Sequence, residues 1–181
     1  TEAVRVFRGT RYQVLFTAAG LPVEQFRRYD MLFIEELADG DSLMSVSNVA
    51  ITHGGNGTLY QALAQGVPVL GIPTLFDQEV NLQRIEALGA GLRMARRDYC
   101  AERLRGAIEH ILRTPSFGQA ARRLKGRIAE YDAPRAAALH IDHFVQTGDP
   151  LSLPKLPPLG VVEGARDATP DEPPARRQVV G

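Results

Sequence analysis

The chain of 181 residues has no tryptophan, a single cysteine and no excess of either charge, with 21 basic and 21 acidic residues. Balanced charge removes the attraction on which nonspecific nucleic-acid binding depends. One cysteine, Cys100, excludes an internal disulfide and is typical of a reducing compartment, so we expect a cytoplasmic protein. No apolar run approaches the ~20 residues of a membrane-spanning helix. The composition predicts a soluble α/β domain.

Proline is scarce in most of the chain and concentrated at its end. Seven of the twelve prolines lie in the last 34 residues, where charges are mixed and aromatic residues almost absent. Such a segment cannot bury enough apolar surface to order itself. We therefore predict a folded domain over 1–147 and a disordered, proline-rich tail over 148–181. Because the chain begins with Thr1 and not methionine, we also expect an upstream part of the protein.

The folded part alternates short apolar runs with helical apolar stripes, after the end of a helix over 1–7. Such alternation is typical of a doubly wound, Rossmann-like parallel sheet. The expected strands are 12–17, 31–34, 48–52, 67–72 and 91–95. The expected helices are 41–45, one from about 57, one from 76, and 100–113, 117–131 and 134–146.

The most informative segment follows the strand at 48–52. His53-Gly54-Gly55-Asn56-Gly57 supplies positions that tolerate positive φ and admit a ligand close to the backbone. Thr58 and an apolar stripe then open a helix, whose free N–H groups and dipole favour an anion such as phosphate. His53 can donate a hydrogen bond to a phosphate oxygen. The alternative is a tight strand-to-helix turn with an incidental histidine.

A second loop follows the strand at 67–72, at the same edge of the sheet. Asp77 and Gln78 are expected on this loop, just before a helix that carries Asn81. A carboxylate accepts paired hydrogen bonds from vicinal hydroxyls, and an amide both donates and accepts, which suits a sugar. The alternative for Asp77 is a helix N-cap.

At this point the sequence resembles a known family. The segments HGGNGTLYQAL, GVPVLGIP and FDQEVN, with their spacing over about forty residues, resemble the donor-binding motif of GT-B nucleotide-sugar glycosyltransferases. A weaker resemblance runs from the start of the chain to about Gln146. It implies the C-terminal half of a GT-B fold.

The resemblance also implies roles for individual residues. It gives His53 the contact with the donor's diphosphate and stabilisation of that leaving group. It gives Gly55, Asn56, Gly57 and Thr58 the phosphate loop, and Asp77 and Gln78 the hydroxyls of the transferred sugar. No catalytic base is expected in this chain.

Two departures from the family pattern concern the nucleoside. The position that usually holds a ribose-binding glutamate is Gln61, whose amide makes weaker bonds to a diol than a carboxylate does. The positions for the nucleobase hold Leu37, Asp39 and Gly40 in place of an aromatic residue and a Pro-Gln pair.

The resemblance implies transfer of a hexose from a nucleoside diphosphate sugar, UDP- or dTDP-linked, to an acceptor hydroxyl of a lipid or natural product. The acceptor would bind to an N-terminal half. No cofactor, metal or nucleic acid is expected, and His140, Asp142 and His143 are read as a solvated helix face in preference to a metal site. The alternatives are a stand-alone donor-binding subunit of a two-chain glycosyltransferase, and a nucleotide-sugar epimerase or sensor of the same architecture.

Overall fold

The computed structural model describes residues 6–7, 9–17, 22–25, 32–35 and 38–151. Val6 and Phe7 are helical, and the predicted tail from 152 onward lies outside the described residues. The strands are β1 (Val14–Thr17), β2 (Leu32–Glu35), β3 (Ala50–Thr52), β4 (Val69–Gly71) and β5 (Gly91–Arg93). The α-helices are α2 (Gly40–Ser45), α3 (Asn56–Ala64), α4 (Phe76–Ala87), α5 (Ala101–Arg113), α6 (Pro115–Ala129) and α7 (Ala133–Thr147). Two 3₁₀ turns, η1 (Val23–Gln25) and η2 (Arg96–Asp98), complete the order.

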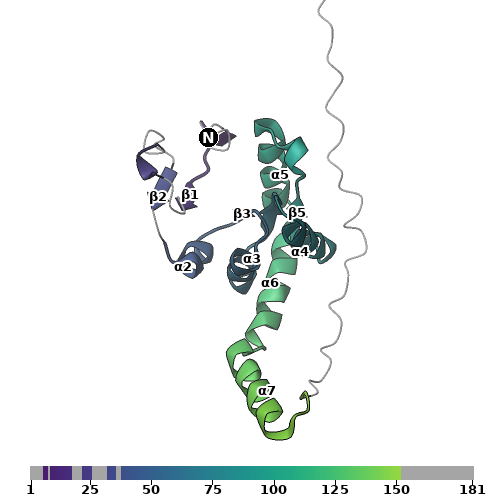
Figure 1. The fold of residues 1–181 in the computed structure, drawn as a ribbon. Helices are drawn as coiled ribbons and strands as arrows, with labels where there is room; N and C mark the ends of the chain where they lie inside the picture. The colour runs from purple at the N-terminus through teal and green to yellow at the C-terminus, as the bar shows by residue number, and fades with distance from the viewer. Residues whose placement is uncertain (1–5, 8, 18–21, 26–31, 36–37, 152–181) are drawn as a thin grey trace, which may run out of the picture.

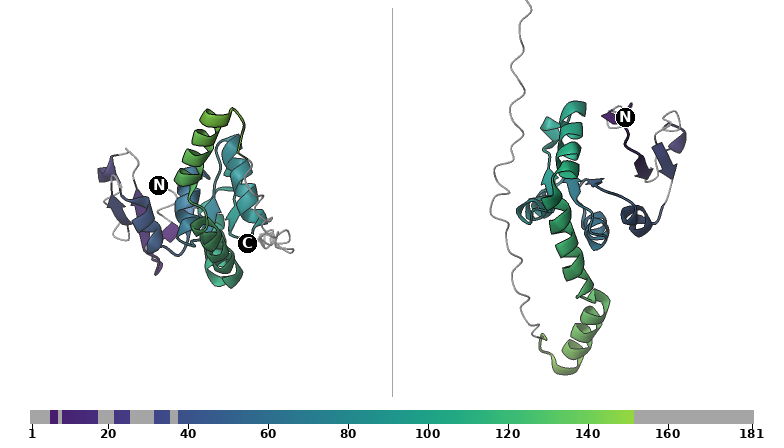
Figure 2. Two further views of the ribbon diagram at one scale, coloured as in Figure 1. Left: turned by 90° about the horizontal axis from the view of Figure 1, so that it is seen from below. Right: turned by 180° about the vertical axis from the view of Figure 1, so that it is seen from behind.

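All strand pairs of the described residues are parallel, but the strands form two sheets. One holds β1 and β2, and the other has the order β3-β4-β5. The first sheet lies apart from the second, and α2 lies on the connection between them (Figure 1). Two further views keep the sheets apart (Figure 2). The prediction of parallel strands and helices is confirmed, while the division into two sheets was not predicted.

The central strand of the three-stranded sheet, β4, is covered on both faces, as in a doubly wound sheet. Val69 and Leu70 of β4 are both fully buried and belong to different clusters, since neighbouring side chains of a strand point to opposite faces. The Val69 cluster includes apolar residues of α3, α4 and α6. The Leu70 cluster includes apolar residues of α5 together with Val6 and Phe7. Helices therefore cover both faces of β4.

The last described helix, α7, lies apart from the sheet (Figure 1). After α6 the chain turns at Asp132, whose side chain accepts from the Arg135 amide, and enters α7. α7 has no buried residue and extends away from the sheet (Figure 1). It ends at Gly148, whose φ of 77° is the left-handed conformation that glycine adopts readily.

Among the described residues, no helix combines the length and the apolar character needed to cross a membrane.

Candidate anion site at the edge of the parallel sheet

The loop after β3 depends on glycine at position 54. Gly54 has a φ of 94°, and a Cβ there would lie 2.7 Å from Leu82 of α4. Its carbonyl oxygen accepts from Asn81 Nδ2 at 3.2 Å, and its amide donates to Thr52 Oγ1 at 3.2 Å. The glycine therefore lets the loop pack directly against α4, which fixes the start of α3 relative to α4.

The start of α3 leaves its backbone donors open. Gly55 is the N-cap residue and makes no side-chain cap bond. The amides of Asn56, Gly57 and Thr58 lie in the first turn, where a helix has no acceptors of its own. A Cβ at Gly57 would meet no atom within 4 Å. The predicted phosphate loop is thus an uncapped, accessible helix N-terminus with a positive dipole end.

The imidazole of His53 lies over this N-terminus. A Cβ built on Gly55 would be 2.7 Å from His53 Nε2, so the ring occupies the space that a side chain at 55 would need. His53 is exposed to solvent. The structure therefore brings a ring N–H donor or acceptor together with the open amides of α3.

The junction between β4 and α4 differs from the prediction. Asp77 and Gln78 lie in the first turn of α4 and not on a loop, and the N-cap residue is Leu75, so the alternative that Asp77 caps the helix is wrong. Gln78 is buried, with an exposed fraction of 6%. Its Oε1 accepts from the Thr74 amide at 2.9 Å, the Thr74 hydroxyl at 3.0 Å and the Leu75 amide at 3.1 Å. Asp77 is exposed.

Gln61 of α3 lies against Gly40, at the start of α2. Its amide atoms lie 2.5–2.6 Å from where a Cβ on Gly40 would be, so the side chain packs on the start of α2. That helix is capped by Asp39, which accepts from the amide and hydroxyl of Ser42. The Ser42 side-chain bond lowers the pKa of Asp39 below its ordinary value. Leu37, the third predicted nucleobase position, lies outside the described residues.

The residues predicted to bind the diphosphate and those predicted to bind the nucleoside are thus joined through α3. His53 lies in the loop before this helix, and Gln61 lies one to two turns into it. Sequence reasoning missed the bond from Asn81 to Gly54 and the role of Thr52, both of which shape the loop. Asn81 was visible as a polar residue in a helix whose other side is apolar. Its partner, a backbone carbonyl 27 residues earlier, left no signal.

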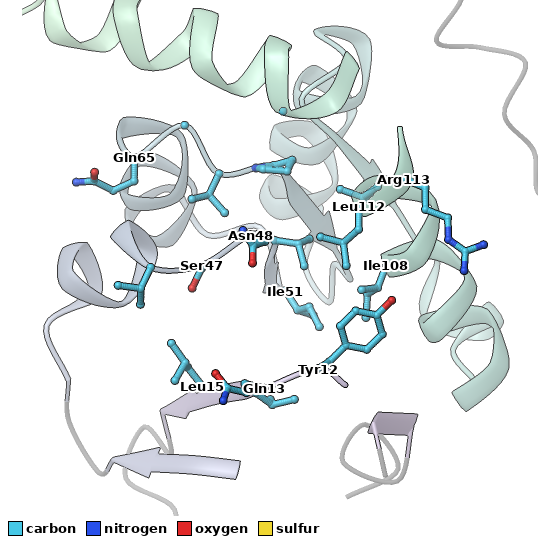
Figure 3. Close-up of a pocket in the computed structure, with 18 of the residues that line it drawn as sticks. Tyr12, Gln13, Leu15, Ser47, Asn48, Ile51, Gln65, Ile108, Leu112 and Arg113 are labelled. Carbon is cyan, nitrogen blue, oxygen red and sulfur yellow. The ribbon is translucent and has the colours of Figure 1, made fainter. Parts of the chain in front are cut away.

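A cavity of about 1260 Å³ lies elsewhere, between β1 and β3, and none of the predicted donor residues lines it (Figure 3). Among the described residues, no three His, Cys, Asp or Glu side chains form a group that could hold a metal ion. Asp142 of α7 accepts from Gln146.

Comparison with known proteins shows which family the chain resembles. The sequence model of the erythromycin biosynthesis protein CIII-like C-terminal domain matches residues 39–142. A PGL/p-HBAD biosynthesis glycosyltransferase of Mycobacterium tuberculosis is 37% identical over 92 residues, which are 51% of this chain and 22% of that protein. The aklavinone 7-beta-L-rhodosaminyltransferase of Streptomyces galilaeus is 36% identical over 93 residues, 51% of this chain and 21% of that protein.

Solved structures agree on the fold. The glycosyltransferase VinC in complex with DTDP matches with a TM-score of 0.62 and 27% identity, over 73% of this chain and 33% of that one. The glycosyltransferase of kitacinnamycin matches with a TM-score of 0.71 at 20% identity, over 78% and 38%. The fold is therefore that of the C-terminal half of a GT-B glycosyltransferase. The chain spans about a fifth of the length of these sequence relatives.

Proposed function

The chain belongs to the family of the erythromycin biosynthesis protein CIII-like C-terminal domain, and on that premise we propose that it supplies the donor site of a glycosyltransferase. Residues 1–147 form the donor-binding domain in this proposal. The reaction transfers a hexose from a nucleoside diphosphate sugar to an acceptor hydroxyl. The observation that carries the proposal is the uncapped start of α3 beneath His53.

The diphosphate of the donor would bind at this helix start. The amides of Gly55, Asn56, Gly57 and Thr58, with the Thr58 hydroxyl, would donate to phosphate oxygens, and the helix dipole would favour the negative charge. His53 would donate a further hydrogen bond from above the loop. Both kinds of donor lie in place before the ligand arrives, so little reorganisation would oppose binding.

The same groups would promote the chemical step. When the bond between the anomeric carbon and the diphosphate oxygen breaks, the diphosphate leaves with the electron pair and gains charge. Donors fixed in advance at that charge lower the barrier, because they strengthen their bonds without rearranging. The acceptor oxygen then bonds to the anomeric carbon, and its proton passes to a base that this proposal puts in an N-terminal half.

The positions of three further side chains suggest contacts with the ribose and the transferred sugar. Gln61 would accept from the ribose hydroxyls next to the start of α2, where Asp39 and Gly40 lie. Asp77, exposed in the first turn of α4, would accept from sugar hydroxyls. Gln78 would contribute its amide NH₂ group, since its oxygen is occupied by three hydrogen bonds. The complex of VinC with DTDP makes dTDP, beside UDP, a suitable probe.

Calorimetry with UDP and dTDP tests the proposal on the chain itself. We expect binding of a diphosphate, and His53→Ala should weaken it by about 1.5–3 kcal/mol, the range for a hydrogen bond to a charged group. His143→Ala on α7, which removes a histidine outside the site, should leave the affinity unchanged. Equal affinity of His53→Ala and the unchanged chain would remove His53 from the site. No binding of either diphosphate by the unchanged chain would contradict the proposal as a whole.

A further inference from the structure

A second cavity, of about 490 Å³, lies between α5 and the turn before β1. Two of its lining residues, Thr10 and Tyr12, are uncharged. The others are three arginines and one glutamate: Arg11, Arg105, Arg113 and Glu109. Three guanidinium groups against one carboxylate leave an excess of two positive charges, in a chain with 21 basic and 21 acidic residues overall. The cavity is therefore a local concentration of positive charge.

Helical spacing explains two of these arginines but not the third. Arg105 and Arg113 each lie one helical turn from Glu109, and both pair with its carboxylate, at 2.9 and 3.3 Å. Such i,i+4 pairs are common on exposed helix faces and contribute little to stability. Arg11 comes from a different segment and forms no ion pair within the described residues. A hydrogen bond from Arg105 lowers the pKa of Glu109, and the charge of Arg11 acts in the same direction.

The turn before β1 is anchored on α5. Thr10 Oγ1 donates to the Phe7 carbonyl oxygen at 2.6 Å and accepts from the Tyr12 amide at 3.3 Å. The rings of Phe7 and Tyr12 meet edge to face, with their centroids 6.3 Å apart. Phe7 is buried in the cluster that includes three residues of α5: Leu104, Ile108 and Ile111. The fold itself thus brings Arg11 beside the helix face that carries Glu109.

This cavity lies away from the open start of α3. Because α5 follows β5 and packs on the sheet, it runs back toward the edge where the strands begin. Arg113, in its last turn, lines the larger cavity together with Pro68, the residue before β4. Figure 3 shows Arg113 and Tyr12 on the same side of that larger cavity. None of the residues that line the smaller cavity belongs to the proposed donor site, so a ligand here would be additional to the donor.

The charge and the donor groups suit a phosphoryl group. Guanidinium groups stay charged at physiological pH and donate in a planar fork that matches phosphate and carboxylate oxygens. A phosphoryl group carries about −1.5 to −2 charges at pH 7 and has three acceptor oxygens, so it matches the excess of two positive charges. A single carboxylate would balance only half of that excess.

We propose that this cavity binds a phosphoryl group, held by Arg11, Arg105 and Arg113. The ligand is inorganic phosphate or the phosphate end of a small phosphate monoester, which present the same oxygens. Glu109 orders two of the guanidinium groups before the ligand arrives, and Arg11 adds the third. No bond is made or broken at this site, and its ligand binds independently of the sugar donor.

Titration of the ¹⁵N-labelled chain with inorganic phosphate tests the proposal, with arginine Nε–H and backbone amide resonances as the readout. We expect saturable shifts at Arg11, Arg105 and Arg113, beyond those that sodium chloride of the same ionic strength produces. Arg11→Gln should weaken binding at least about tenfold, because it removes a hydrogen bond to a charged group. Arg97→Gln, at a side chain that is 88% exposed and outside the cavity, is the matched control and should leave the affinity unchanged.

Glu109→Gln tests the charge match in the opposite direction. Loss of this carboxylate raises the excess from two positive charges to three, so phosphate should bind at least about threefold more tightly. Unchanged or weaker binding by this variant would contradict the proposal.

Three results of the titration would also overturn the proposal. The absence of saturable shifts at the three arginines would mean that the cavity binds no phosphate. Equal affinity of Arg11→Gln and the unchanged chain would mean that the third guanidinium takes no part. Shifts confined to the amides of residues 55–58 would mean that phosphate binds only at the start of α3, which supports the donor site and removes this one.

A parallel titration with glycerol 3-phosphate separates the two sources of the phosphoryl group. Tighter binding of this compound than of inorganic phosphate, with shifts at the same arginines, identifies a phosphate monoester as the ligand. Equal or weaker binding identifies the free ion. Both results support the proposal, since each puts the phosphoryl group on the same three side chains.

Discussion

The two strand-to-helix junctions at the carboxyl edge of the sheet differ in how the loop before the helix is hydrogen-bonded. At the β3–α3 junction the cap residue is Gly55, and no side chain bonds to the first amides of the helix. At the β4–α4 junction the buried Gln78 bonds to two backbone amides and the hydroxyl of Thr74. Both helix starts lack a side-chain cap on their first-turn amides, and the loop before α4 is in addition bonded to Gln78 of its own helix.

This difference indicates that the two neighbouring loops bind different parts of a ligand. An anion binds where donors lack partners, because it need not displace any existing bond. The loop before α4 is instead held by its bonds to Gln78. Asp77, exposed in the first turn of that helix, can then bind a neutral group that carries hydroxyls. We therefore assign the diphosphate to α3 and the sugar to α4 as the working hypothesis.

The largest effect on stability is expected from a substitution at Gly54, in the loop between β3 and α3. Gly54→Ala introduces a Cβ at a φ of 94° and 2.7 Å from Leu82. Backbone strain of about 1–3 kcal/mol and overpacking of about 1–3 kcal/mol should add, so we expect a loss of roughly 2–6 kcal/mol in the free energy of unfolding. Urea unfolding of the chain measures it.

Gly57→Ala is the matched control for this change. A Cβ at Gly57 meets no atom within 4 Å, and alanine is the better helix former by up to about 1 kcal/mol. This variant should be as stable as the unchanged chain or more so, but bind UDP more weakly if the phosphate approaches the backbone. Equal stability of both alanine variants would contradict the packing account of the loop.

A smaller effect is expected at the bonded junction. Gln78→Ala removes the acceptor of three hydrogen bonds and should cost about 0.5–2 kcal/mol of unfolding free energy, the usual range for a lost helix cap. Gln78→Glu keeps an acceptor and should keep most of that stability, while it loses the amide NH₂ donor. If the NH₂ group binds sugar, Gln78→Glu should weaken binding of the nucleotide sugar and not of the free diphosphate. Unfolding curves of both variants, with calorimetry of both ligands, separate the two roles.

The smallest effect on stability is expected at Asp77. The exposed carboxylate lies in the first turn of α4 without a capping role, so Asp77→Asn should cost at most about 0.3–1 kcal/mol through the lost charge–dipole interaction. Its affinity for a UDP-hexose should nevertheless fall, while that for UDP stays the same. A matched loss for both ligands, measured by calorimetry, would show that Asp77 does not select the sugar.

The sequence was sufficient to predict the strand-loop-helix order, because apolar periodicity and glycine–proline punctuation are local signals. The observed bounds of α4, α5 and α7 differ from those expected by only a residue or two at the ends we predicted. The cap at α4 was missed for a local reason. Gln78 stands three residues after its cap position, as in a capping box, but Leu75 occupies the position where serine or threonine would have marked it.

The separation of β1 from β3 could not be predicted from the sequence for a different reason. Which strands are neighbours depends on contacts between distant segments, and Ile51 has the same sequence appearance in an edge strand as in a central one. The contact of Gln61 with Gly40 is likewise long-range, although both positions had been singled out.

Backbone amide NMR of the ¹⁵N-labelled chain during titration with UDP tests the central claim most directly. If the open start of α3 holds the diphosphate, the amides of Gly55, Asn56, Gly57 and Thr58 will shift most, in the direction of stronger hydrogen bonding. The amides of Thr74 and Leu75, already bonded to Gln78, will move little. Shifts centred on Thr74 and Leu75, with the α3 amides unmoved at saturation, would contradict the account.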